Sequence, residues 1–91
     1  MVWQIEFDPR TDKDFKGIEK VDRARIFNFL KERVAILDDV RSIGQPLSGP
    51  ELGKFWKYRV GDYRIICDIQ DVKVTVLVVR VGHRREVYRK S

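Results

Sequence analysis

The chain has 91 residues, of which 43% are hydrophobic and 36% are charged, and its formal net charge is +5. This length supports one hydrophobic core and is too short for two ordinary domains, so we expect a single domain over residues 1–91. The content of large apolar residues excludes a disordered chain, and no apolar run approaches the roughly 18 residues of a membrane span.

The chain contains one cysteine, Cys67, and one histidine, His83. An intramolecular disulfide is therefore excluded, and neither a Cys/His metal site nor a cofactor is expected. A single thiol is typical of the reducing cytosol, and residues 1–7 lack the basic and apolar regions of a secretory signal, so we expect a cytoplasmic protein. Cys67 lies in an apolar stretch, which indicates a core residue rather than a nucleophile.

The positive charge is concentrated in the C-terminal part. Residues 1–53 carry nine Lys or Arg and ten Asp or Glu, which gives a net charge of −1. Residues 54–91 carry ten Lys or Arg and four Asp or Glu, which gives a net charge of +6. Such asymmetry indicates an anionic partner, nucleic acid above all, although basic residues also serve solubility. A membrane surface fits less well, because the charges fall in strand-like segments rather than on a basic amphipathic helix.

The N-terminal half predicts one strand and two helices. Residues 2–7 have the composition of a strand, and Asp8-Pro9 is typical of a helix start, so a short helix should follow and end near Gly17. Asp22 is the expected cap of a second helix. Apolar residues at three- and four-residue steps predict its buried face, which we assign to Ala24, Phe27, Leu30, Val34 and Leu37, widened by Ile26, Phe29 and Ile36.

The C-terminal half predicts three more strands. Residues 42–53 are rich in Gly and Pro and read as a loop, after which apolar residues alternate with a period of two over 54–60, 63–69 and 73–81. The expected fold class is therefore α+β, with two N-terminal helices packed on one face of a small, mostly antiparallel, four-stranded sheet in the order β-α-α-β-β-β. Phe27, Leu30, Val34, Trp56, Ile65 and Val76 should be largely buried.

A two-residue hairpin turn at Gly61-Asp62 would fix the register of the first two of these strands. Lys57, Arg59 and Arg64 then share one face of the sheet, opposite the apolar face, and Arg59 opposes Arg64 directly. Like charges paired across strands are destabilising, which indicates an anion-binding face, since guanidinium groups suit phosphate oxygens. Alternatively, these long side chains extend into water at little cost.

The segment 81–89 combines basic residues with one aromatic ring. This combination suits RNA, because cations bind phosphates and rings stack on bases, whereas a basic tail alone is weak evidence for catalysis. The candidates are His83, which could move protons, and Arg84, Arg85, Tyr88 and Arg89.

Three segments together resemble the RelE family of bacterial toxins. They are residues 46–52, residues 56–66 with the motif RVGDYR, and residues 81–89 with the motif VGHRxxVYR. The resemblance covers nearly the whole chain and includes the Asp-Pro helix start.

The resemblance implies a toxin of a type II toxin-antitoxin system, a ribosome-dependent endoribonuclease that cuts mRNA in the ribosomal A site without a metal. It implies a cognate antitoxin as partner, with operator DNA contacted only through the antitoxin complex. The catalytic positions that carry over are Lys57, Arg64, Arg84 and Tyr88, and Arg59 occupies the place of a second Lys in some members. We add His83 as a candidate acid and assign RNA binding to Lys54, Arg59, Arg85 and Arg89.

Two other functions remain open. Members of the ParE branch share the fold and the basic tail but inhibit DNA gyrase. A nucleic-acid-binding module without catalytic activity would show binding that weakens smoothly with salt and no RNA cleavage.

Overall fold

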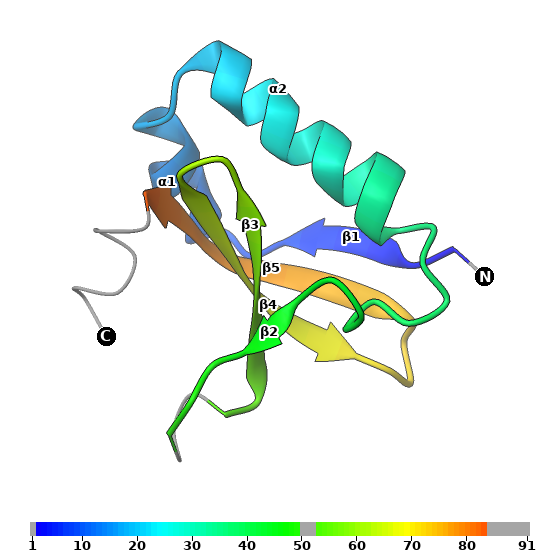
Figure 1. Ribbon diagram of the computed structural model, residues 1–91. Coiled ribbons are helices and arrows are strands. Elements are labelled where there is room, and N and C mark those ends of the chain that lie inside the picture. Colours follow the sequence, from blue (N-terminus) through cyan, green and yellow to red (C-terminus); the bar gives the residue numbers. More distant parts are fainter. Residues whose placement is uncertain (1, 50–52, 84–91) are drawn as a thin grey trace.

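A five-stranded sheet and a helical layer form the computed structural model, which describes residues 2–49 and 53–83 (Figure 1). The elements in chain order are β1 (Gln4–Phe7), α1 (Thr11–Lys16), α2 (Lys20–Phe29), the π-helical segment η1 (Leu30–Val34), β2 (Gln45–Pro46), β3 (Phe55–Val60), β4 (Tyr63–Gln70) and β5 (Thr75–His83). The strand order is β1-β5-β4-β3-β2, with β1 parallel to β5 and the other pairs antiparallel. The predicted α+β class is confirmed.

The sheet has one strand more than the sequence predicted. Gln45 and Pro46 form a two-residue strand that pairs with Lys57 and Trp56 of β3, and the Leu47 amide donates to the Phe55 carbonyl at 3.0 Å. A strand of two residues is too short to show an alternating pattern, so the sequence predicts only a loop here. At an edge, Pro46 costs the sheet no interior hydrogen bond.

The β3–β4 hairpin has the predicted register. Val60 pairs with Tyr63, Arg59 with Arg64, and Lys57 with Ile66. Gly61 has φ of 59°, which an L side chain rarely adopts, so glycine at the first turn position allows this short connection.

The next hairpin is longer than the sequence suggested. Val74 has φ of 50°, and its amide donates to the Asp71 carbonyl at 3.1 Å. β5 therefore begins at Thr75 rather than at Lys73, the start of the predicted strand.

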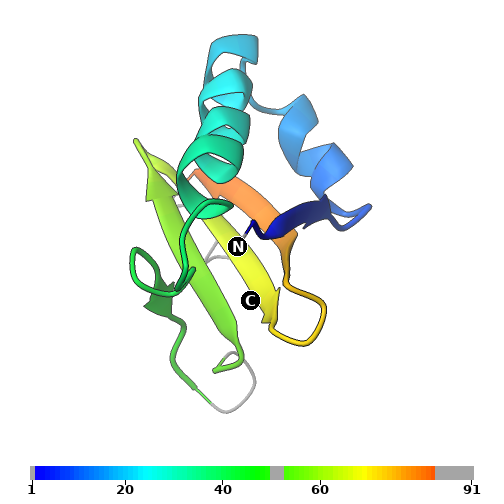
Figure 2. The same ribbon diagram turned by 90° about the vertical axis from the view of Figure 1, so that its right-hand side faces the viewer.

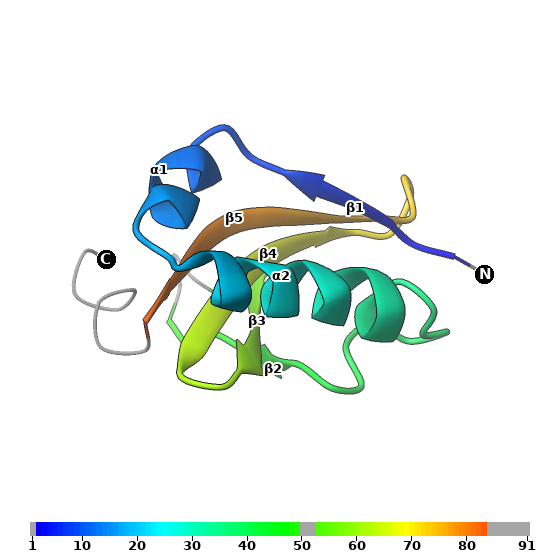
Figure 3. The same cartoon turned by 90° about the horizontal axis from the view of Figure 1, so that it is seen from above.

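Both helices cover one face of the sheet, as expected (Figure 2). α1 packs beside the end of β5, while α2 extends over the sheet (Figure 3). The core between the layers includes Trp3, Ile18, Ile26, Leu30, Val34, Val40, Tyr58, Ile65, Cys67, Ile69, Val76, Val78 and Val81. The opposite face carries a smaller apolar cluster of Leu47, Ile66 and Val79, flanked by Phe55 and Leu77.

The buried face of α2 and η1 differs from the predicted one. Ile26, Leu30 and Val34 are fully buried, whereas Ala24 and Ile36 are exposed, and Phe27, Phe29 and Leu37 are half-buried. Trp56 of β3, which was also expected in the core, is half-buried. Adjacent apolar residues make several helix faces equally plausible from sequence. The π-helical turn, in which the Ala35 amide donates to the Leu30 carbonyl at 2.9 Å, also departs from the α-helical period.

The helix starts differ from the predicted caps in detail. α1 begins at Thr11, and Asp8 organises the preceding turn: its carboxylate accepts from the Arg10 amide and its carbonyl accepts from the Thr11 hydroxyl. α2 begins at Lys20 with Glu19 before it, so Asp22 lies inside the first turn and is not the cap. In residues 2–49 and 53–83, no helix is long and apolar enough to cross a membrane.

Leu30→Ala should lower the free energy of unfolding by about 2–5 kcal/mol, because the Leu30 side chain is fully buried and its truncation leaves a cavity. Ile36→Ala is the matched control: Ile36 is 63% exposed, and we expect a change within about 0.5 kcal/mol. Denaturant titration measures both values. A loss below about 1 kcal/mol for Leu30→Ala would contradict this assignment of the core.

Candidate functional site

The three predicted cations of the β3–β4 hairpin line one hollow. It has a volume of about 170 Å³ and is formed by Ile43, Gln45, Lys57, Tyr58, Arg59 and Arg64. Arg59 and Arg64 are directly paired across the two strands, and Lys57 lies two residues before Arg59 on β3. Three positive charges therefore converge on a small concave surface, which we call the cationic hollow.

Arg64 is the most constrained member of the cationic hollow. Its Nη1 atom is buried and has no hydrogen-bond partner among the described residues. Leaving a buried charged donor unsatisfied costs at least about 1–3 kcal/mol, and Coulomb repulsion from the opposing Arg59 adds to this cost. An anion in the hollow would reduce the repulsion between the two guanidinium groups.

The strand that carries Lys57 and Arg59 is fixed by the core residue between them. The Tyr58 hydroxyl donates to the Val40 carbonyl at 2.6 Å, and the Tyr58 ring lies edge-on to Phe29. Burial raises the pKa of Tyr58, so the phenol stays neutral and keeps its donor proton. A Cβ atom on Gly44 would lie 3.1 Å from the Tyr58 ring, so the chain that enters β2 also packs closely here.

Other predicted site residues lie elsewhere. Lys54 precedes β3, with its ammonium 5.0 Å from the centroid of the Phe55 ring. His83 ends β5 and pairs with Tyr63, on the helix side of the sheet, so the structure does not place it beside Lys57 and Arg64. Arg84, Arg85, Tyr88 and Arg89 lie outside the described residues.

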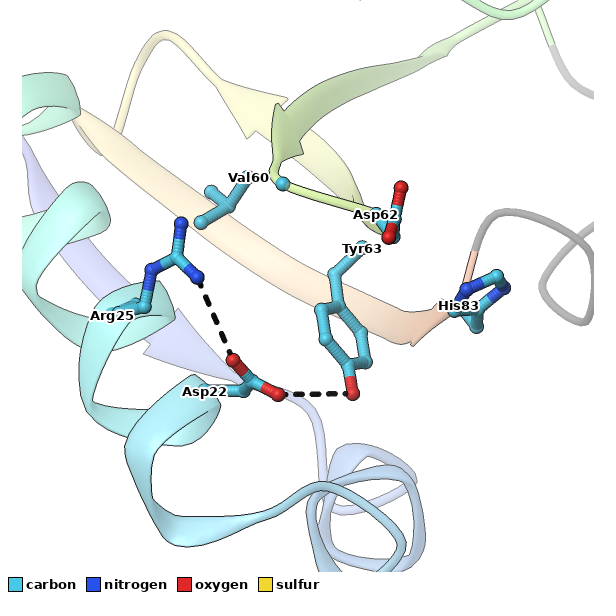
Figure 4. A pocket seen from close by; sticks show the side chains of 7 residues that line it. Asp22, Arg25, Val60, Asp62, Tyr63 and His83 are labelled. Carbon is cyan, nitrogen blue, oxygen red and sulfur yellow. Dashed lines mark hydrogen bonds and ion pairs between the residues drawn. The ribbon is translucent and has the colours of Figure 1, made fainter.

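A second hollow, which the sequence did not predict, lies on the helix side of the same hairpin (Figure 4). It has a volume of about 230 Å³ and is lined by Asp22, Arg25, Val60, Gly61, Asp62, Tyr63 and His83. Asp22 accepts from the Tyr63 hydroxyl at 3.4 Å and faces the Arg25 guanidinium at 3.7 Å. The sequence offers no signal for this hollow, because an aspartate at position 22 is equally typical of a helix start.

Comparisons with known proteins identify the family. The family model of the ParE toxin of the type II toxin-antitoxin system parDE matches residues 5–88. The mRNA interferase toxin RelE of Escherichia coli K12 is 31% identical over 94 residues, which cover 100% of this chain and 95% of that protein. The chain belongs to the RelE family of toxins.

Further similarities agree with this family. Toxin RelG of Mycobacterium tuberculosis is 40% identical over 48 residues, which span 53% of this chain and 54% of RelG. The structure of the toxin-antitoxin complex RelBE2 from M. tuberculosis matches with a TM-score of 0.83 at 24% identity, covering 94% of this chain and 95% of the other. The isolated E. coli RelE toxin matches with a TM-score of 0.68 at 24% identity, covering 97% and 93%. These two structures show the RelE fold.

Cys67 of this RelE-family toxin should not react with a thiol reagent in the native state. Its side chain is fully buried and burial raises the pKa of the thiol, so the reactive thiolate is both scarce and inaccessible. With Ellman's reagent at pH 8 we expect no appreciable labelling of native protein and complete labelling in guanidinium. The chain has one cysteine, so the signal is unambiguous. Rapid stoichiometric labelling of native protein would show that Cys67 is accessible.

Proposed function

We propose that this toxin is a ribosome-dependent endoribonuclease that cuts mRNA in the A site and inhibits translation. The observation that carries the proposal is the cationic hollow, where Lys57, Arg59 and Arg64 converge and Arg64 has a buried donor without a partner among the described residues. The E. coli relative, whose alignment covers the whole chain, is named an mRNA interferase. Both observations favour RNA as the anion.

The proposed reaction is an intramolecular transfer at phosphorus. The ribose 2′-OH loses its proton to a base and attacks the adjacent phosphorus, and the bond to the 5′ oxygen of the next nucleotide breaks as that oxygen gains a proton. The products are a 2′,3′-cyclic phosphate and a 5′-OH. The RNA supplies its own nucleophile, so the protein has to stabilise added negative charge and transfer two protons.

We assign the charge stabilisation to Arg64 and Arg84. Arg64 is held on β4, and a preorganised donor on a rigid element can stabilise a transition state without reorganising. Lys57 is the proposed base, and Arg59 contacts the RNA backbone with Lys54, Arg85 and Arg89. Tyr88 orients the 2′-OH or stacks on a base. His83 lies on the helix side of the sheet, away from Lys57 and Arg64. Its proposed role as the acid therefore requires that the bound RNA passes around the end of the hairpin.

Arg64→Ala and Arg84→Ala should each lower single-turnover cleavage of mRNA on programmed ribosomes by about 100- to 1000-fold. Ribosome binding should fall far less, because many other phosphate contacts remain. The measurement is primer extension on a translated mRNA, with ribosome binding measured in parallel.

Arg33→Ala is the control for these two variants. It removes the same charge from an exposed position on η1 and should leave cleavage unchanged. If Arg64→Ala and Arg84→Ala cut at the wild-type rate at saturation, the two arginines serve only to bind RNA. If the wild-type protein binds ribosomes but cleaves nothing, the binding-module alternative replaces the enzyme.

Inhibition of DNA gyrase is the second candidate function. The observation that favours it is the family model, which is that of the ParE toxin. A supercoiling assay with purified gyrase separates the two functions. Gyrase inhibition without cleavage of translated mRNA would replace the ribonuclease proposal.

We also propose a cognate antitoxin as partner, with operator DNA bound only through their complex. The M. tuberculosis relative of known structure was determined as a toxin-antitoxin complex, and complexes of RelE with RelB are known from other organisms. Because the hollow is cationic, we expect an acidic antitoxin segment to cover or distort it.

Replacing Lys57, Arg59 and Arg64 together by Ala should weaken antitoxin binding by about tenfold or more, because it removes three charges from the proposed contact. The control replaces three exposed cations, Lys31, Arg33 and Lys73, by Ala and changes the net charge equally. Isothermal titration with the antitoxin measures both affinities. Equal affinity of the cationic-hollow variant and the wild type would place the antitoxin on another surface, such as the helical side.

A further inference from the structure

The hollow on the helix side of the hairpin brings together groups from three elements. Asp22 and Arg25 come from α2, Tyr63 begins β4, and His83 ends β5. Figure 4 shows the Asp22 carboxylate between the Arg25 guanidinium and the Tyr63 hydroxyl, with His83 beyond the Tyr63 ring. The Tyr63 and His83 rings meet edge to face, with centroids 6.0 Å apart and planes at 78°.

The charges of this hollow do not suit a phosphate. Two carboxylates, Asp22 and Asp62, accompany one guanidinium, Arg25. Its volume of about 230 Å³ lies below the range of about 300–1,000 Å³ that is typical of sites for drug-sized ligands. A small planar molecule with several N–H donors, such as a nucleobase, fits both its charge and its size.

The Asp22 carboxylate retains acceptor capacity. Its two contacts with described residues are long, 3.4 Å to the Tyr63 hydroxyl and 3.7 Å to Arg25 Nη1. A carboxylate offers about four lone-pair positions, so these contacts leave room for further donors. Of the four RNA bases, only guanine presents two adjacent N–H donors, N1–H and the N2 amino group, on its Watson–Crick edge, together with the O6 acceptor.

We propose that this hollow binds a guanine base of single-stranded RNA. The Asp22 carboxylate accepts from guanine N1–H and N2–H, Arg25 donates to O6, and the rings of Tyr63 and His83 contact the base. Recognition of an unstacked base by its Watson–Crick edge and by aromatic contact is the usual mode for single-stranded RNA. The inference rests on the proposed function to the extent that this guanine belongs to the cleaved mRNA.

The hairpin places the two hollows on opposite faces of the same strands. Tyr63 and Arg64 are adjacent on β4. Tyr63 faces the hollow on the helix side, which we call the guanine hollow, and Arg64 faces the cationic hollow. At the hairpin end that separates the two faces, a Cβ atom on Gly61 would lie 3.7 Å from Arg25 Nη2, and Arg59 Nε donates to the Gly61 carbonyl at 3.4 Å, so guanidinium groups from both hollows lie close to this turn. The proposed assignment makes Asp22 a determinant of which nucleotide lies next to the cut, rather than a catalytic residue.

The first test measures binding without a ribosome. We would titrate the protein with 5′-GMP, 5′-IMP and 5′-AMP and follow the ring signals of Tyr63 and His83 by NMR. Inosine lacks only the N2 amino group, so it removes one of the two proposed donors to Asp22. A good bidentate contact contributes about 1–3 kcal/mol of discrimination, so GMP should bind at least about fivefold more tightly than AMP, with IMP between them.

Asp22→Asn should abolish the preference for GMP over IMP and AMP, because the amide presents an N–H donor in place of one acceptor. Asp38→Asn, at an exposed position away from the hollow, removes the same charge and should retain the preference. If Asp22→Asn fails to fold, Arg25→Met serves instead, since the Arg25 side chain is 61% exposed and the thioether side chain has no donor for O6.

The assignment would be overturned if the wild type bound all three nucleotides equally. It would also be overturned if GMP shifted NMR signals elsewhere in the protein and left those of the Tyr63 and His83 rings unchanged. The second test compares cleavage at codons with and without guanine in wild type and Asp22→Asn. If both proteins cleave RNA with the same codon preference, the guanine site is refuted and the ribonuclease proposal stands. If the protein binds GMP selectively but cleaves no mRNA, the guanine site stands and the ribonuclease proposal is refuted.

Discussion

The two-residue turn at Gly61 and Asp62 is the constraint on which both hollows depend. It aligns Arg59 with Arg64 and sets the facing of every residue in β3 and β4. Because side chains alternate with a period of two, a slip of β3 by one residue would turn Lys57 and Arg59 toward the helices and Tyr58 toward solvent. The positive φ of Gly61 makes this register accessible, and the burial of Tyr58 and Ile65 makes it favourable.

The stability of the apolar face compensates for the electrostatic cost of the cationic one. On the helix side, Tyr58, Ile65 and Cys67 pack in the core and Tyr58 donates to the Val40 carbonyl. On the other side, Arg59 opposes Arg64, an arrangement that weakens the hairpin in the absence of an anion. Folding and not a ligand therefore brings the three cations together, which is the preorganisation that the proposed RNA site requires.

The sequence predicted the hairpin better than the helices, for a physical reason. Alternation around a Gly-Asp turn has one consistent solution, so the register and the face of Lys57, Arg59 and Arg64 followed directly. In α2, adjacent apolar residues such as Ile26 and Phe27 satisfy more than one helical stripe, and the π-helical turn at Leu30–Val34 changes the period. The guanine hollow could not be predicted, because its Asp22–Tyr63 contact joins residues 41 positions apart and exists only after the layers pack.

The end of β5 carries His83 to the guanine hollow and leads directly to Arg84, so its position matters to both proposals. β1 pairs with β5 only as far as Val78, and no other strand in residues 2–49 and 53–83 lies along the later part of that edge. Asp14 of α1 occupies this edge: its carboxylate accepts from the Val81 amide at 2.9 Å and from Arg80 Nε at 3.1 Å. The Asp14 side chain is only 13% exposed, so these bonds are largely shielded from water and anchor α1 to the strand. The short N-terminal helix thereby serves a purpose beyond covering the core, since it fixes the end of the strand that precedes the proposed catalytic Arg84 in the chain.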